Sequence, residues 1–486
     1  MTLRHCLAVL LLASAVLAPA PAATAAPSLA DLIERRVDGN GVLAHLRAWE
    51  RAADRNGGHR ATGSPGLAES ARYLVDRLTT AGYRVVRRPV PFEDFAFDAE
   101  SARLSGGAGQ VPGPLGAGRE VRLLMGRWSP SLPEGGIDAR LAVPNAGGDG
   151  CADGDYAGQD LTGAVVMVDL TRCALTRLAE VAAGLGARAM LTYLPSPRPG
   201  NIWRLGVLPP YQIGLPVATI TQAEAGALAP AAANGDVRLH LDLRGHEVTG
   251  TTEVILAETA GGDPEKVVMA GAHLDSVTEG PGINDNGTSA AALLETALQL
   301  APYQHRVRDK VRFAWWGAEE LYALDSAYYV VHLSQTERAA IAAYLNFELI
   351  ASPNSGRFVM DGDDSDHPGE GAGPAPEGSA ALEAAFSGYF RHRGLPFLTN
   401  DVEDVRSDHE PFMKAGIPVG GIYSGGGLDV KTEEVARVFG GQAGDFYDPC
   451  YHQPCDRIAN LDTAALHVNA KAIAWVLTRL AEGISP

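Results

Sequence analysis

The sequence predicts an α/β fold in which a mixed, mostly parallel central sheet is covered by helices on both faces. Continuous apolar runs, such as 267–270 and 311–316, lack the alternation of a half-exposed strand, which is typical of strands buried on both faces. Segments with helical periodicity separate these runs, as in βαβ units. The chain has 486 residues, of which 46% are hydrophobic and 20% charged, so it is globular and long enough for more than one core.

The first part of the fold is predicted to be helical. Apolar residues recur at spacings of three and four in 29–36, 41–55 and 66–81, which predicts three helices. The segment 57–66, GGHRATGSPG, is turn-forming throughout. Residues 83–92 alternate, and we expect a strand there.

Residues 96–245 differ in character and are predicted to form an inserted domain of mixed β/α structure. Gly and Pro are dense there, and the acidic residues are scattered, so we interpret the insertion as an accessory domain without chemistry of its own. The main domain is then discontinuous, 27–95 and 246–486. The expected strands of the insertion are 121–125, 164–169, 189–193 and 217–220, with a helix at 175–185.

The α/β pattern returns after residue 246 and continues to the last helix. Residues 356–378 are rich in Gly, Pro and Asp and are predicted to be a loop. The expected strands are 254–258, 266–272, 311–316, 343–350 and 419–423, and the expected helices are 288–300, 319–333 and 461–480.

The first 26 residues have the pattern of a secretory signal peptide. Arg4 and His5 precede an apolar run at 7–17, and small residues follow at 23–26. We therefore expect a secreted protein. No later stretch reaches the roughly 20 apolar residues of a membrane span. The net charge of −18 argues against nucleic acid or an anionic membrane as the main partner.

Four cysteines remain after the predicted signal peptide. An even number in an exported chain favours disulfides. The pairs Cys151 with Cys173 and Cys450 with Cys455 are each local in the sequence, and we expect these two bonds. A thiolate zinc site is the alternative.

The segment 270–287, AGAHLDSVTEGPGINDNG, is the first candidate for a functional site. His273 and Asp275 follow a buried strand, and Asp285 follows a glycine-rich loop. Ligand sites in open α/β sheets form outside the carboxyl ends of the strands. A simple strand cap is the alternative interpretation of the His and the first Asp.

Further potential ligands follow at comparable places. Glu319 and Glu320 come after the strand at 311–316, although acidic residues are also favoured in a first helical turn. Glu348 lies within an apolar strand, where a buried acid needs a partner. His452 lies between two cysteines. Imidazole and carboxylate ligands suit zinc, and there are enough carboxylates for two ions that share a bridging ligand.

These segments resemble the secreted co-catalytic di-zinc aminopeptidases of the aminopeptidase Y and bacterial aminopeptidase S type. The resemblance is carried by AGAHLDS, GINDNG, RFAWWGAEE, YLNF followed by an acid, RSDHxPF and CYHxxCD, in this order. The insertion resembles the protease-associated domain through Gly150-Cys151, Asp155-Tyr156, 163–169, Cys173 and 186–189. That resemblance implies a lid-like domain beside the active site and a bond between Cys151 and Cys173.

The resemblance implies two zinc ions per chain and a ligand for each at a matching position. His273 and Glu348 would bind the first ion, Glu320 and His452 the second, and Asp285 would bridge both. Glu348 stands where the family has an aspartate, and it would also help to anchor the free amine of the substrate. Its extra methylene moves the carboxylate by about 1.5 Å, so the backbone or the rotamer must compensate if the first ion is to bind fully.

The resemblance also implies the catalytic roles. Glu319 would be the general base for a hydroxide that bridges the two ions, and Tyr451 would stabilise the oxyanion. Asp275 would orient the imidazole of His273. Arg406 would line the substrate end of the site. His409 is interpreted as structural.

The expected protein is a secreted, monomeric zinc aminopeptidase that hydrolyses the N-terminal peptide bond of peptides and proteins. Some relatives bind calcium through acidic residues of the last helix, but His467 and Lys471 stand at the matching positions, so no calcium is expected. The alternatives are carboxypeptidase or dipeptidase action, a single-zinc glutaminyl cyclase, and a non-catalytic binding protein.

Overall fold

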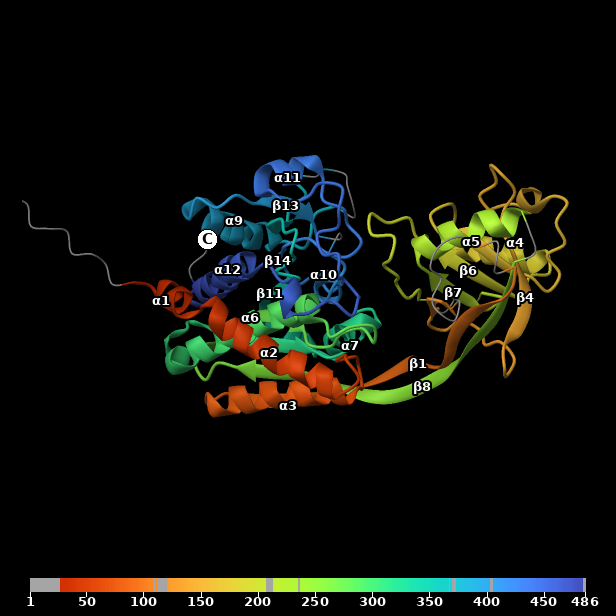
Figure 1. The fold of residues 1–486 in the computed structure, drawn as a ribbon. Helices are drawn as coiled ribbons and strands as arrows, with labels where there is room; N and C mark the ends of the chain where they lie inside the picture. The colour runs from red at the N-terminus through yellow and green to blue at the C-terminus, as the bar shows by residue number, and fades with distance from the viewer. Residues whose placement is uncertain are drawn as a thin grey trace, which may run out of the picture.

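The fold consists of two bodies that are joined by one long two-stranded ribbon (Figure 1). The computed structural model describes residues 27–107, 111, 120–206, 213–234, 237–366, 368, 373–402 and 405–483. The predicted signal peptide, 1–26, lies outside the described residues. We call residues 96–245 the insertion and the rest of the described chain the main body.

The main body contains most of the helices and the central sheet. Its strands are β1 (Arg84–Gly106) and β8 (Arg238–Glu258), both shared with the insertion, then β9 (Asp263–His273), β10 (Asp309–Trp316), β11 (Ile341–Glu348), β12 (Phe358–Asp361), β13 (Leu398–Asp401) and β14 (Val419–Tyr423). Its helices are α1 (Leu29–Arg36), α2 (Gly39–Arg55), α3 (Pro65–Thr80), α6 (Ser289–Leu300), α7 (Leu324–Val331), α8 (Gln335–Ala340), α9 (Ser379–His392), α10 (His409–Lys414), α11 (Glu433–Phe439) and α12 (Thr463–Ala481).

The order of strands in this sheet is β13-β12-β14-β11-β9-β10-β8. The pairs β13/β12, β14/β11, β11/β9 and β9/β10 are parallel, whereas β12/β14 and β10/β8 are antiparallel. A mixed, mostly parallel sheet was the fold class predicted from the sequence, and the structure confirms it.

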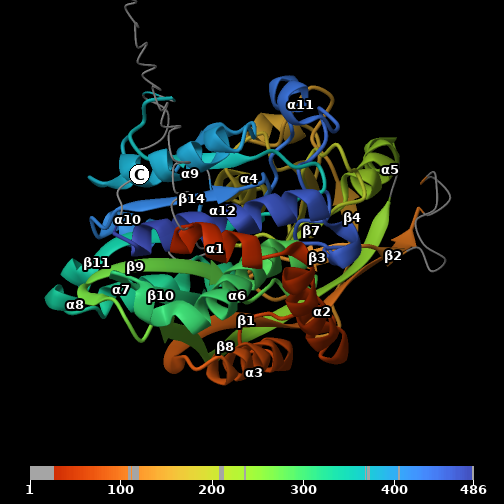
Figure 2. The same cartoon turned by 90° about the vertical axis from the view of Figure 1, so that its left-hand side faces the viewer.

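Both faces of the sheet are buried, which explains why its strands are apolar without alternation. Phe313 and Trp315 of β10 pack on the side of α2, α6 and α12, while Ala314 and Trp316 pack on the side of α7 and α10. On the first side α1 lies along α12 (Figure 2), where Trp475 Nε1 donates to Asp31 at 3.0 Å. The carboxyl ends of the central strands are thereby held in fixed positions.

The ribbon of β1 and β8 is longer than the sequence predicted. The strand expected at 83–92 continues to Gly106, and its register with β8 runs from Arg84 opposite Glu258 to Gly106 opposite Arg238, with two register shifts. The domain boundaries predicted at 95/96 and 245/246 therefore fall inside paired strands. The predicted boundaries lie where the side-chain composition changes, but the backbone hydrogen bonds between β1 and β8 continue across these positions.

The insertion has its own core, and its strands continue the sheet beyond β8. Its strands and helices are β2 (Glu120–Val121), β3 (Leu123–Met125), β4 (Ile137–Ala142), β5 (Val165–Asp169), α4 (Leu175–Gly184), β6 (Ala189–Tyr193), β7 (Val217–Ile220) and α5 (Gln222–Asn234). The sheet order is β8-β4-β5-β6-β7-β3, with β4, β5, β6 and β7 parallel. The predicted bond between Cys151 and Cys173 is present.

Two predicted elements are wrong. The helix expected at 319–333 is divided into a 3-10 turn, Glu319–Leu321, and α7, because Tyr322 (φ 65°) and Ala323 (φ 52°) adopt left-handed backbone conformations that end the first turn. The loop expected at 356–378 contains β12, whose Val359 and Met360 are fully buried. None of the helices in the described part of the chain is long and apolar enough to cross a membrane.

Candidate metal centre

Three neighbouring strands deliver the first candidate ligands to one edge of the sheet. β9 ends at His273, β10 is followed by Glu319 and Glu320, and β11 ends at Glu348. These strands run parallel in the order β11-β9-β10, so their carboxyl ends meet. Asp285 reaches the same place from the loop before α6, where its peptide bond to Asn286 is cis.

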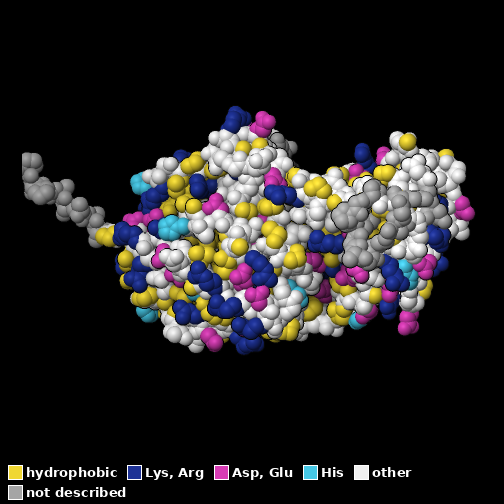
Figure 3. All heavy atoms as spheres, viewed as in Figure 1, with side chains coloured by type: hydrophobic (Ala, Val, Ile, Leu, Met, Phe, Trp, Pro, Cys, Tyr) yellow, Lys and Arg dark blue, Asp and Glu magenta, His cyan; other side chains and the backbone are white. Residues whose placement is uncertain are grey.

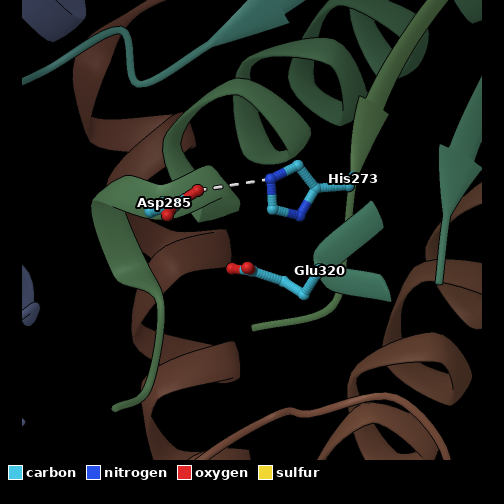
Figure 4. Close-up of side chains that lie close together, drawn as sticks. All are labelled: His273, Asp285 and Glu320. Carbon is cyan, nitrogen blue, oxygen red and sulfur yellow. Dashed lines mark ion pairs between the residues drawn. The ribbon is translucent and has the colours of Figure 1, made fainter. Parts of the chain in front are cut away.

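Two groups of side chains share Asp285, one on each of its carboxylate oxygens. On one side, His273 Nε2 lies 3.2 Å from Asp285 Oδ1 and 3.3 Å from Glu348 Oε1. On the other, His452 Nε2 lies 3.1 Å from Asp285 Oδ2 and 3.2 Å from Glu320 Oε2. Figure 4 shows His273, Asp285 and Glu320 converging from three separate elements. The structure thus brings together all five residues that the sequence proposed as metal ligands.

The donor set and its spacing fit zinc. Ligands about 2.0–2.2 Å from a tetrahedral zinc ion lie roughly 3.3–3.6 Å from one another, and the four distances above are close to this range. The buried atoms Glu320 Oε1 and Glu348 Oε1 have no hydrogen-bond partner among the described residues, as expected of oxygens that face a cation. Imidazole nitrogen and carboxylate oxygen without thiolate are the ligands of zinc or another borderline metal.

The raised pKa values of the buried acids also indicate a site for a cation. Burial raises the pKa of Glu319 well above its ordinary value, and neighbouring acids add to the effect. Burial likewise raises the pKa values of Glu320 and Glu348. These shifts mean that several anions held together are costly in this site. A bound divalent ion would relieve that cost.

The pKa values of the two histidines are also raised, but by the neighbouring carboxylates and not by burial. Burial by itself lowers the pKa of His273, but the carboxylates of Glu348 and Glu319 overcome it and raise the pKa well above the ordinary value. In the same way Glu320 and Asp285 raise the pKa of His452 to about 10. Both imidazoles are therefore surrounded by negative charge, and zinc competes for them with protons.

Asp275 lies behind His273, as the sequence predicted, and it has a second set of partners. His273 Nδ1 lies 3.2 Å from the backbone carbonyl oxygen of Asp275 and 3.4 Å from its Oδ1. The two carboxylate oxygens of Asp275 accept hydrogen bonds of 3.2 Å from the backbone N–H groups of Glu319 and Glu320. Asp275 therefore contacts the imidazole through both its carbonyl and its carboxylate, and the carboxylate also fixes the turn that carries both glutamates.

Glu348 reaches the site despite its extra methylene. Its Oε2 accepts a hydrogen bond of 2.7 Å from Ser407 Oγ, and Asn346 Nδ2 donates to that same hydroxyl at 3.2 Å. The next residue, Leu349, has a left-handed backbone with φ 44°. The glutamate is therefore held by a specific partner, and the backbone bends directly after it.

Arg60 and Asp456 support the site and were not singled out in the sequence. Arg60 is fully buried and donates to the carbonyls of Leu274, Pro281 and Gly282, between two of the candidate ligands. Asp456 accepts from the backbone N–H of Asn284 at 2.7 Å and of Asp285 at 3.1 Å. The only sequence signals were an arginine among turn residues and an acid after the last cysteine.

A cavity of about 440 Å³ opens onto the candidate ligands, and both bodies line it. Glu319, Tyr451 and Arg406 are in its wall, as predicted for residues that act on substrate. Arg127 and Arg204 line it from the insertion, and Figure 3 shows a hollow between the two bodies. His409 is fully buried away from the cavity, with Nε2 2.7 Å from the carbonyl of Val402, which agrees with a structural role.

His452 lies in a short ring closed by the predicted bond between Cys450 and Cys455. Its backbone is left-handed, with φ 56°. The ring of Tyr451 stacks on its imidazole at 3.8 Å between centroids. The disulfide thus holds a candidate ligand and its aromatic neighbour in a conformation that a free loop would rarely adopt.

Comparison with known proteins gives matches along most of the chain. Residues 254–477 match the family model described as Peptidase family M28. The chain is 37% identical over 464 residues to an aminopeptidase of Pseudomonas aeruginosa strain UCBPP-PA14, covering 92% of this chain and 82% of that protein. It is 36% identical over 462 residues to a probable lipoprotein aminopeptidase, LpqL, of Mycobacterium tuberculosis, covering 95% and 88%.

Solved structures show the same fold at low sequence identity. BSAP, a zinc aminopeptidase from Bacillus subtilis, aligns with a TM-score of 0.67 at 21% identity, over 92% of this chain and 95% of that one. An aminopeptidase from Aneurinibacillus sp. strain AM-1 aligns with a TM-score of 0.63 at 21% identity, over 93% and 96%. The chain therefore belongs to peptidase family M28 and is a hydrolase of the metallo-aminopeptidase type.

Proposed function

We propose that this enzyme binds two zinc ions and removes the N-terminal residue of peptides with Glu319 as its general base. The observation that carries the proposal is the pair of ligand groups that share Asp285, one on each oxygen. His273 and Glu348 would hold one ion, and Glu320 and His452 the other. When bound, the zinc ions supply Lewis-acid activation of the scissile carbonyl and of the attacking water.

Glu319 is suited to move a proton because it is adjacent to both groups but belongs to neither. Its Oε2 lies 3.7 Å from His273 Nε2, farther than the other carboxylates, and Asp275 fixes its backbone. Burial raises the pKa of its carboxyl group, and a raised pKa is what a base needs to keep a proton and return it to the leaving amine. Tyr451, in the cavity wall, would donate a hydrogen bond to the developing oxyanion.

The charge of the cavity wall supports exopeptidase action. A free N-terminal amine is a cation at neutral pH, and Glu348 is the carboxylate beside which it would lie. Arg406, in the cavity wall, would contact the carbonyl groups of the bound chain. The insertion contributes Arg127 and Arg204 to the same wall.

The decisive test is hydrolysis of leucyl p-nitroanilide by the purified protein beside its Glu319→Gln variant. General-base catalysis contributes roughly 10²–10⁴-fold, so the variant should lose that factor in kcat while it still binds two zinc ions by elemental analysis. An acetyl-blocked substrate should not be cleaved. A variant with unchanged kcat would exclude Glu319 as the base, and one zinc per chain would favour the single-zinc glutaminyl cyclase.

Three further assignments belong to this proposal. The enzyme acts as a monomer and is secreted; the pattern of residues 1–26 and the two disulfides support secretion. The insertion is a protease-associated domain. Each is tested on the native protein: the mature N-terminus by sequencing of the exported chain, the disulfides by thiol titration, and the oligomeric state by sedimentation.

A further inference from the structure

One segment of the insertion contacts the main body at several places around the metal centre. We call residues 198–206, between β6 and β7, the strap; in Figure 1 this yellow-green chain extends from the insertion toward the main body. It is fixed to the insertion by the hydrogen bond of Thr219 Oγ1 to the carbonyl of Trp203, 2.7 Å, and by that of Arg127 N–H to the carbonyl of Leu205, 2.8 Å.

The strap's contacts with the main body follow one another along the chain. Arg198 forms an ion pair with Asp445 at 2.5 Å. Asn201 Nδ2 donates to the carbonyl of Pro449 at 2.8 Å. Farther along the strap, Arg204 Nε donates to Glu279 at 2.6 Å, on the loop between His273 and Asp285. The strap therefore contacts two of the loops that carry candidate ligands.

Trp203 has the contact closest to the chemistry. Its Nε1 donates to the carbonyl of Tyr451 at 3.2 Å, and its ring packs edge-on against Phe446 at 5.6 Å between centroids. The carbonyl of Tyr451 belongs to the peptide group that precedes His452, so a donor at this oxygen fixes the rotation of that peptide plane about His452. Gln453 Nε2 also reaches this carbonyl, but at 3.5 Å, and its shorter bond of 2.6 Å is to the carbonyl of Ile202 in the strap.

This restraint matters because His452 has an unfavourable backbone. A non-glycine residue with φ 56° is strained relative to an ordinary backbone conformation. A turn that relaxed from this conformation would move both the imidazole of His452 and the stacked phenol of Tyr451. Within the main body the disulfide limits this relaxation, and the strap limits it from the insertion.

We propose that Trp203 is a positioning residue for catalysis, through which the insertion holds the Tyr451–His452 peptide in the conformation that the second zinc ion and the oxyanion require. The insertion is then part of the active-site framework as well as a wall of the cavity. The inference rests on the proposed function through the role of His452 as a ligand.

The test is Trp203→Phe in the full chain, which removes the N–H donor and keeps an aromatic ring against Phe446. Loss of a group that orients a ligand typically weakens metal binding 10–100-fold. We expect roughly tenfold weaker binding of the second zinc ion, measured on metal-free protein by competition with a chromophoric chelator. We also expect a similar fall in kcat with KM nearly unchanged, because the phenol of Tyr451 acts in the transition state.

The matched control is Trp475→Phe, which removes the same kind of hydrogen bond, to Asp31, on the far side of the main body. It should leave both zinc affinities and kcat as in the wild type. Asn201→Ala is a milder second variant, which loosens the strap without removing a buried ring, and it should shift zinc affinity and kcat in the same direction as Trp203→Phe.

The outcomes separate the two proposals. If Trp203→Phe and Asn201→Ala keep wild-type zinc affinity and kcat, or raise KM alone, the strap is only a wall and the inference is overturned while the proposed function stands. If wild-type protein binds no zinc and has no turnover, the proposed function fails and the inference fails with it.

Discussion

Replacement of Glu348 by aspartate tests the least ordinary of the proposed ligands. The change withdraws the carboxylate by about 1.5 Å. The contacts of 3.3 Å to His273 Nε2 and 2.7 Å to Ser407 Oγ would then stretch beyond hydrogen-bonding distance. Metal–ligand bonds tolerate only about ±0.2 Å, so the shorter side chain cannot hold the first ion without a backbone movement.

The expected loss is 10–100-fold in affinity for the first zinc ion, or about 1.4–2.7 kcal/mol. The affinity falls because one ligand no longer reaches the ion. Ser407 also loses a charged acceptor, a bond worth roughly 1.5–3 kcal/mol, which lowers the stability of the metal-free protein. The second ion, held by His452 and Glu320, should keep most of its affinity because its ligands do not include residue 348.

The assay is a zinc titration of metal-free protein in chelator-buffered solution, followed by kcat at saturating zinc. Ser407→Ala is the control, because it removes the hydrogen bond but keeps the ligand, and it should lose clearly less zinc affinity than Glu348→Asp. An aspartate variant with two ions bound at wild-type affinity and full turnover would refute the reasoning, since it would show that the backbone adapts to either length.

Three other perturbations have defined outcomes. Replacing both Cys450 and Cys455 by alanine should lower the unfolding free energy by about 2 kcal/mol, because the short ring no longer restricts the unfolded chain. It should also lower the affinity for one zinc ion only. An equal fall in affinity for both ions would contradict the placement of His452. Arg60→Met should cost several kcal/mol in urea unfolding, because three buried carbonyls lose their donor; a change below about 1 kcal/mol would show that water replaces it. Burial lowers the pKa of His409, so the stability from its neutral form is present above its ordinary pKa of about 6.5 and is lost as the pH falls below it. His409→Gln should reduce the fall in Tm between pH 7 and pH 5, and an identical pH profile would exclude this histidine as its source.

Much of the fold could be predicted because the hydrophobic pattern identifies the buried strands, and the positions of the strand ends indicate which residues lie together. The apolar runs of β9, β10 and β11 identify buried parallel strands, and residues at their carboxyl ends must meet. This is why His273, Glu320 and Glu348 could be placed together before any coordinates were known. The ring around His452 was recognisable from two cysteines five residues apart.

The parts that could not be predicted depend on contacts between distant segments. The ribbon of β1 and β8 is stabilised by backbone pairing across some 150 residues of chain, to which side-chain composition gives no guide. Local propensity favours one continuous helix after Glu319, but the left-handed backbone of Tyr322 and Ala323 ends the first turn. In that turn the backbone N–H groups of Glu319 and Glu320 donate to Asp275, a distant residue. Arg60 and Trp203 act on carbonyl groups, and a sequence does not show which carbonyls lie near a side chain.

Backbone strain is concentrated where this protein does its chemistry. Seven non-glycine residues in the described part of the chain have positive φ, and five of them line the cavity: Tyr322, Ala323, Leu349, Arg406 and His452. Each such residue costs on the order of 1 kcal/mol or more, so contacts elsewhere must hold these conformations. Arg406 and His452 are themselves predicted site residues, Leu349 directly follows Glu348, and Tyr322 and Ala323 end the turn that carries Glu319 and Glu320. The strap, the disulfide ring, Arg60 and Asp275 supply such contacts around the candidate ligands.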